Sequence, residues 1–152
     1  MEISSLLPPE NIITDLQAVS RRDIFSQLIN PLCVSQVVRD RETFADALEQ
    51  REEQITTQME NQVAMPHARS LTVTRLGMSL GITPEPGLNF GSDPNRKCRL
   101  FFLIAIPNFA PSAHLSLLKK LAGFAHDQKR LDRFFNCRTK KQMIKQLQSF
   151  RG

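Results

Sequence analysis

The sequence predicts an α/β fold in which a mixed β-sheet is sandwiched between layers of helices. Two segments with helical periodicity come first, strand-like segments occupy the middle, and helical periodicity returns towards the end. The second strand-like segment, residues 99–106, is almost continuously apolar, which is typical of a central strand buried on both faces. This order of elements favours helices above and below the sheet. At 152 residues the chain can close around one core, so we expect a single domain spanning residues 1–152.

The first helix is predicted from a start signal that is followed by a repeating apolar pattern. In the segment from Ser20 to Asp23, we expect the serine to cap the helix and the aspartate to reach back to it. Apolar residues then recur every four positions, as on the buried face of a helix. We expect this helix to end near Pro31 or Cys33.

The second helix is predicted over residues 41–53. Phe44, Ala47 and Leu48 fall on one face, which we expect to be buried. Arg51 continues this apolar stripe. A charged side chain on the inward face of a helix is costly unless it is paired or has a function, so Arg51 is a candidate functional residue.

The middle of the chain changes from helical to strand-like patterning. Residues 76–82 alternate weakly between apolar and small residues and are predicted to form a strand. Prolines and glycines dominate residues 83–91, which we expect to be a loop. Residues 99–106 then form the predicted central strand.

Three further helices are predicted in the last third of the chain. Ser112 is expected to cap the first, which carries five apolar residues between positions 115 and 122. Two shorter helices should follow, around residues 131–135 and 143–150. Asp127 is expected to cap the first of these, and we assign no role to its neighbour His126.

Composition excludes several classes of protein. Residues 1–13 lack the pattern of a secretory signal, and the longest apolar run is too short to cross a bilayer, so we expect no membrane insertion. The cysteines show neither disulfide nor metal spacing and are interpreted as small hydrophobic residues in a reducing cytoplasm; they are Cys33, Cys98 and Cys137. The net charge of +5 permits a nucleic-acid partner, but the basic residues are dispersed and the chain has no Tyr or Trp for base stacking.

The segment over residues 51–69, REEQITTQMENQVAMPHAR, contains the main candidate for chemistry. Pro66 fixes its own φ and holds Met65 in an extended conformation, so His67 follows a rigid turn. Imidazole can be a nucleophile near neutral pH. Alone, this pattern would favour a surface loop histidine without a function.

Residues 61–69, with Ala-Met-Pro-His-Ala-Arg at their centre, resemble the active-site segment of the fructose/mannitol-type enzyme IIA family of the phosphoenolpyruvate-dependent phosphotransferase system. The family's usual segment is T-G-x-G-N-G-[IV]-A-[ILM]-P-H-[AG], and the resemblance extends over essentially the whole chain. The positions that match in register are Thr57, Asn61, Val63, Ala64, Met65, Pro66 and His67. The resemblance implies that His67 is phosphorylated, at Nε2.

Two further positions match the family at the same intervals. Arg51 lies sixteen residues before His67, and His114 lies forty-seven residues after it. A guanidinium offers planar donors to phosphoryl oxygens, and a neutral histidine near a helix start can donate one N–H. Singly, Arg51 could instead be a charge at a helix C-terminus, and His114 a histidine bonded to backbone. Asn61 and Arg69 are added to the predicted site as binding residues.

Three positions depart from the family's pattern. Gln58, Glu60 and Gln62 stand where the family has glycine, and larger side chains restrict positive φ and close backbone approach. Glu60 is also expected to bring a negative charge close to the phosphoryl group. These substitutions motivate the alternative of an interaction module that has the same fold but is deficient in phosphotransfer.

The function that the resemblance implies is a cytoplasmic phosphocarrier without a cofactor. His67 would accept a phosphoryl group from a histidine phosphocarrier protein, with Arg51 and His114 stabilising the transferred charge. Because the chain ends without an attached enzyme IIB or permease segment, it looks most like the stand-alone nitrogen-regulatory enzyme IIA. We therefore expect its partner to be a regulatory target protein rather than an enzyme IIB. A nucleic-acid partner has no motif to support it, and a zinc site at His67 and His114 lacks further ligands.

Overall fold

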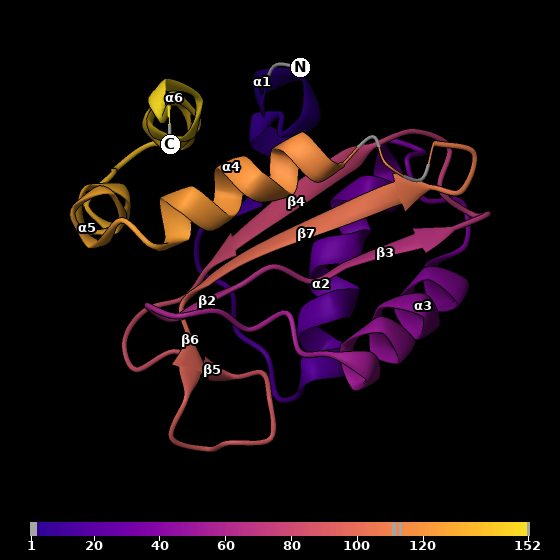
Figure 1. Cartoon of the computed structure of the whole chain (residues 1–152), viewed down its shortest axis with the longest axis horizontal. Helices are drawn as coiled ribbons and strands as arrows, with labels where there is room; N and C mark the ends of the chain where they lie inside the picture. The colour runs from indigo at the N-terminus through magenta and orange to yellow at the C-terminus, as the bar shows by residue number, and fades with distance from the viewer. Residues whose placement is uncertain (1–2, 111, 113, 152) are drawn as a thin grey trace.

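The computed structural model describes residues 3–110, 112 and 114–151. Its helices and strands are arranged around a mixed sheet (Figure 1). The α-helices are α1 (Ile3–Leu6), α2 (Arg21–Val34), α3 (Arg41–Gln54), α4 (Leu115–Ala125), α5 (Gln128–Phe135) and α6 (Lys140–Ser149), with a short 3-10 turn at Pro9–Asn11. The strands are β1 (Ile12–Ile13), β2 (Val63–Ala64), β3 (His67–Ser70), β4 (Gly77–Ile82), β5 (Leu88–Asn89), β6 (Lys97–Cys98) and β7 (Leu100–Pro107).

The predicted mixed sheet is confirmed, with β7 at its centre. β4 pairs with β7 in antiparallel fashion, whereas β1 is parallel to β4. The short strands β2 and β3 both run parallel to β7 along its other edge. Every residue of β7 is buried, as the continuous apolar pattern predicts.

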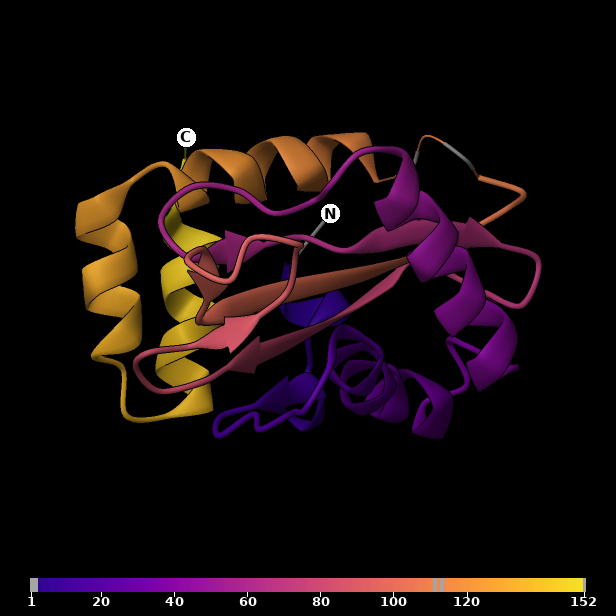
Figure 2. The same ribbon diagram turned by 90° about the horizontal axis from the view of Figure 1, so that it is seen from below.

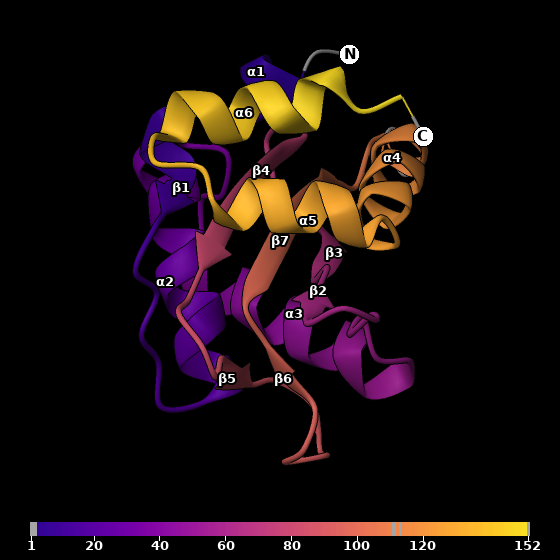
Figure 3. The same cartoon turned by 90° about the vertical axis from the view of Figure 1, so that its left-hand side faces the viewer.

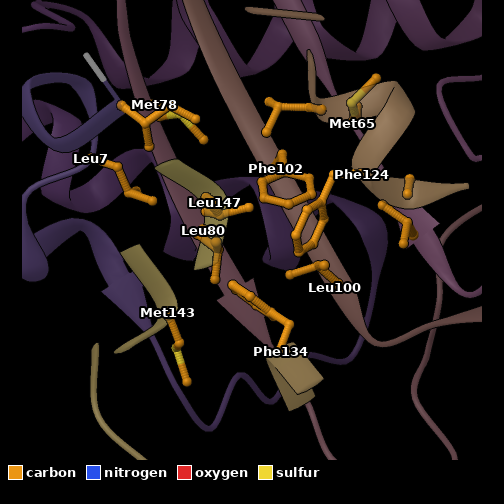
Figure 4. Close-up of a cluster of buried hydrophobic side chains, with 14 of the residues drawn as sticks. Leu7, Met65, Met78, Leu80, Leu100, Phe102, Phe124, Phe134, Met143 and Leu147 are labelled. Carbon is orange, nitrogen blue, oxygen red and sulfur yellow. The ribbon is translucent and has the colours of Figure 1, made fainter. Parts of the chain in front are cut away.

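Helices cover both faces of the sheet, so the predicted sandwich is confirmed (Figures 1 and 3). Alternate residues of β7 point to opposite faces: Phe102 belongs to the core shared with α1, α4, α5 and α6, and Phe101 to the core shared with α2 and α3. Figure 4 shows the first of these cores, in which Phe102, Phe124 and Phe134 gather close to Leu100. None of the described helices combines the length and apolar character needed to cross a bilayer.

The predicted starts of α2, α3 and α5 are confirmed by side-chain caps. Ser20 accepts a hydrogen bond from the Asp23 N–H, and Asp23 accepts one from the Val19 N–H. Of the two expected ends of α2, Pro31 and Cys33, the second is confirmed to within one residue, because the helix continues through the proline to Val34. Leu32, one residue further on, is fully buried, and this packing outweighs the hydrogen bond that proline removes.

The predicted cap at Ser112 is wrong. Helix α4 begins at Leu115, and His114 occupies the N-cap position without a side-chain cap. Ser112 is exposed and contributes only its carbonyl, which accepts a hydrogen bond from the Leu115 N–H. This start places His114 beside His67, the first residue of the edge strand β3.

The predicted loop over residues 83–91 contains a strand, β5, that pairs with β6 in a small second sheet. The strands β1, β2 and β3 were also not predicted, because segments of two to four residues are too short to show the alternating pattern of a strand. Cys98 is buried, whereas Cys33 and Cys137 are partly exposed, and burial raises the pKa of Cys98 to about 12.

Candidate functional site

The position of His67 is set by an interruption in the edge of the sheet. β2 and β3 lie one after the other beside β7, and Met65 and Pro66 separate them. Proline cannot donate to a strand ladder, so pairing breaks there, although the Pro66 carbonyl still accepts a hydrogen bond from the Ile104 N–H at 3.0 Å. His67 is the first residue of β3, opposite Ile104.

The alternation of β3 brings His67 and Arg69 to the same face. Ala68 between them packs into the core shared with α2 and α3, so its two neighbours point away from that core. They line a cleft of about 600 Å³ together with Arg51 from α3 and His114 at the start of α4. Four of the five predicted site residues therefore meet in one cleft.

The His67 ring is held in one orientation by a backbone hydrogen bond. Its Nδ1 lies 2.8 Å from the carbonyl oxygen of Met65. Because a carbonyl only accepts, Nδ1 carries the proton and Nε2 presents a lone pair. This geometry favours Nε2 as the nucleophilic atom.

The two histidine rings lie close together in the cleft, and the pKa of each is lowered. Their centroids are 6.1 Å apart and the ring planes are inclined by 34°. Burial lowers the pKa of His67, the hydrogen bond to Met65 opposes this change, and the charge of Arg51 lowers the pKa further. Burial also lowers the pKa of His114, and the charges of His67 and Arg69 add to this effect.

A titration of His67 is therefore expected to show a pKa below the ordinary value of 6.5. A lowered pKa means that the ring stays neutral as the pH falls through 6.5 and becomes protonated only below it. The measurement is an NMR titration of the ring protons, with an unfolded peptide spanning residues 63–71 as reference. A midpoint at or above that of the peptide would contradict the proposed burial of the ring.

Arg51 and His114 differ in whether their side chains already form hydrogen bonds within the protein. One arm of Arg51 donates to the carbonyl of Ile55, 2.7 Å away at the end of α3, so part of its role is that of a helix-end cation. A guanidinium has five N–H donors, and the others remain available to the cleft. The Nδ1 of His114 is buried and has no hydrogen-bond partner within the part of the chain that the structure describes.

Comparison with known proteins identifies the family. The profile of the family described as "Phosphoenolpyruvate-dependent sugar phosphotransferase system, EIIA 2" matches residues 5–150. The chain belongs to this family. It is accordingly an EIIA phosphocarrier, a phosphotransferase component that acts through a phosphohistidine.

Curated relatives of this EIIA chain are fructose-specific proteins. It is 25% identical over 122 residues to the fructose-specific EIIABC component of Bacillus subtilis, covering 80% of this chain and 19% of the relative. It is 26% identical over 121 residues to the fructose-specific EIIA component of Haloferax volcanii, covering 80% and 78% of the two chains. The chain thus spans only about a fifth of the Bacillus protein.

Solved structures confirm the EIIA fold. The nitrogen regulatory protein IIA-Ntr from Neisseria meningitidis matches with a TM-score of 0.85 and 23% identity, over 95% of this chain and 98% of that one. IIA mannitol from Escherichia coli matches with a TM-score of 0.75 and 22% identity, over 91% and 96%. The Escherichia coli enzyme has also been solved in complex with phosphorylated IIB mannitol.

The sequence patterns of this EIIA chain did not indicate the role of Glu52. Its side chain is only 6% exposed and accepts hydrogen bonds from the Thr56 hydroxyl, the Thr57 N–H and the Thr57 hydroxyl, at 2.6 to 2.7 Å. The Thr57 carbonyl in turn accepts a hydrogen bond from the Met65 N–H at 3.0 Å. A continuous series of hydrogen bonds therefore links Glu52 to the His67 ring. The available signal was a carboxylate four residues after Leu48, on the buried stripe of α3.

Asn61 is the predicted site residue that does not line the cleft. Its side-chain amide donates to the carbonyl of Ala125, 2.9 Å away at the end of α4. Its φ is +61° and that of Gln62 is +65°, so the chain retains positive φ at one of the positions where the family has glycine. Asn61 connects the loop before β2 to helix α4.

The expectation that Glu60 would place a negative charge beside the phosphoryl group is wrong. Its side chain is 76% exposed and lies 3.6 Å from His126, at the end of α4 distant from His114. It does not line the cleft. Across the described ranges, no group of three side chains that could hold a metal ion is found.

Proposed function

We propose that His67 is the phosphohistidine of this EIIA chain. The observation that carries the proposal is the hydrogen bond from Nδ1 to the Met65 carbonyl, which leaves Nε2 free in the cleft. Nε2 attacks the phosphorus of a phosphohistidine on a donor phosphocarrier protein; a new N–P bond forms while the old one breaks, and the donor ring keeps the electron pair. The ring of His67 gains positive charge in this step, and the Met65 carbonyl stabilises it through Nδ1–H.

Arg51 and His114 are proposed to bind the oxygens of the phosphoryl group. Arg51 provides positive charge and further N–H donors, and the unpartnered Nδ1 of His114 can complete the set. Arg69 lines the same cleft and adds a second positive charge that attracts the anionic donor site.

The test is incubation with phosphoenolpyruvate, enzyme I and a histidine phosphocarrier protein, followed by intact mass measurement. We expect the gain of one acid-labile phosphoryl group, located on His67 by fragmentation. A folded sample that gains no mass with any donor would instead support the interaction module deficient in phosphotransfer.

We also propose that the chain acts in regulation in the cytoplasm, where partner proteins respond to its phosphorylation state. We prefer this function to the alternative, transfer of the phosphoryl group to a sugar-specific EIIB. A basic surface on α5 and α6, to which Lys129, Lys141 and Lys145 contribute, supports this preference, because these residues lie outside the cleft that contains His67. Rapid and complete transfer of the phosphoryl group from the phosphorylated chain to a fructose-specific EIIB would instead favour a function in sugar transport.

Glu52 is proposed as a positioning residue for His67. Replacing Glu52 by glutamine keeps the shape but turns one acceptor oxygen into an N–H₂ group facing the donors of Thr57. We expect phosphorylation to slow by about 10- to 100-fold, since small displacements of a reacting group are costly. The rate is measured by mass spectrometry, and NMR of the ring nitrogens reports the His67 tautomer.

The matched control is Glu53→Gln on the exposed side of the same helix turn. This variant should keep both the rate and the tautomer of the unmodified protein. If Glu52→Gln reduced stability but left the rate and the tautomer unchanged, Glu52 would be a structural residue only.

A further inference from the structure

The positive charge of this chain is concentrated in its C-terminal helices. Residues 114–152 contain ten Lys and Arg but only two acidic residues, a net charge of +8. Residues 1–113 contain ten Lys and Arg and thirteen Asp and Glu, a net charge of −3. Half of the Lys and Arg residues of the chain therefore lie in the segment that forms α4, α5 and α6 (Figure 3).

These basic side chains are accessible, and none of them forms an ion pair with the residues that the structure describes. All ten are exposed or partly exposed; they are Lys119, Lys120, Lys129, Arg130, Arg133, Arg138, Lys140, Lys141, Lys145 and Arg151. The ion pairs found among the described residues all involve other side chains. The two acidic residues of the layer are engaged locally: Asp127 caps α5, and Asp132 accepts a hydrogen bond from Gln128.

The arrangement of these charges is unfavourable for the helices that carry them. Lys129 and Arg130 lie in the first turn of α5, and Lys140 and Lys141 in the first turn of α6, where the helix dipole favours negative charge. Lys141 and Lys145 are four residues apart on one face and repel each other. A bound anionic partner would relieve both conflicts.

A groove beside α6 provides a shape for such a partner. It has a volume of about 470 Å³ and lies where α1 and α6 meet. Lys141, Lys145 and Arg151 line it together with Ile144, which is partly buried between the two lysines. α5 and α6 lie side by side, so the charges of α5 extend the same surface (Figure 2).

We propose that this groove binds an acidic segment of a partner protein, with an apolar side chain of that segment on Ile144 and its carboxylates on Lys141, Lys145 and Arg151. Charge complementarity and the apolar floor of the groove carry the proposal. Its biological purpose rests on the proposed regulatory function, but the binding does not require phosphoryl transfer. The groove and the His67 cleft share no lining residue.

Two other anionic partners fit this surface less well. Single-stranded nucleic acid would need exposed aromatic side chains, whereas Phe134 and Phe150 are buried and Arg99 lies over the ring of Phe135. A membrane surface would need apolar side chains to insert. Within the described ranges, the large exposed apolar residues all lie outside α5 and α6.

The test is fluorescence titration with a labelled peptide of glutamates that carries leucine at every fourth position. The double variant Lys141→Glu/Lys145→Glu should weaken binding by at least about tenfold, because attraction becomes repulsion. The control is Arg39→Glu/Arg75→Glu, which lowers the net charge by the same amount on a different surface and should change affinity by less than about twofold. Both variants should still be phosphorylated, since neither touches the cleft.

Three results would overturn the proposal. One is equal weakening by both double variants, which would mean a response to net charge alone. Another is failure of the folded, unmodified protein to bind the peptide. The third is tighter binding to duplex DNA or to phosphatidylglycerol vesicles than to the peptide, which would assign the surface to nucleic acid or lipid.

Discussion

Replacing His67 by alanine is expected to abolish phosphorylation of the chain. The side chain provides the attacking Nε2, and no other imidazole stands in its position on β3. Removing the nucleophile of a covalent intermediate leaves nothing to carry the phosphoryl group, so the loss should exceed about a thousandfold. The measurement is the intact mass after incubation with phosphoenolpyruvate, enzyme I and the donor protein, as a function of time.

The matched control is His126→Ala. His126 lies at the far end of α4, exposed and facing Glu60, and does not line the cleft. Its removal should leave the rate of phosphorylation unchanged. If His67→Ala were labelled as fast as the unmodified protein, the phosphohistidine would have to be another residue, and His114 would be examined next.

The sequence alone defined the elements whose causes are local. Helices α2, α3 and α5 begin at caps, and β7 is a continuous apolar run, so each could be placed without knowledge of its neighbours. The short strands β2 and β3 are defined by their pairing with β7, and α4 begins after His114 without a side-chain cap. Such elements have no local signal, which explains the missed strands and the wrong cap at Ser112.

The candidate site could be predicted where residues match the family, and not where the fold alone makes the connection. Arg51, Arg69 and His114 were placed with His67 from spacing and resemblance. Glu52 acts through a series of backbone and side-chain hydrogen bonds that no spacing rule describes. Asn61 matches the family's pattern, yet its amide is bound to the end of α4 instead of lining the cleft.

Replacing Arg51 by glutamine is expected to slow phosphorylation by about 100- to 1,000-fold, which is typical for loss of one strong donor to a developing oxyanion. The guanidinium lies in the cleft with His67 and contributes to lowering its pKa. Removing its charge should therefore raise the pKa of His67 while the rate falls. A higher pKa alone slows the reaction only at pH values where it increases protonation of the ring, so a fall in rate that persists well above the pKa identifies Arg51 as an oxygen-binding group.

Arg51 also donates to the Ile55 carbonyl, so part of its effect is on the end of α3. That contribution is one exposed hydrogen bond, about 1 kcal/mol of stability, and a thermal melt would measure it separately. Arg51→Lys should retain the charge but lose the planar set of guanidinium N–H donors. Its rate of phosphorylation should lie between those of the unmodified protein and Arg51→Gln. Gln50→Ala, which removes an uncharged side chain from the same cleft, is the control and should have little effect. A rate for Arg51→Gln equal to that of the control would restrict Arg51 to its helix-end role, and Arg69 would then be the remaining cation of the cleft.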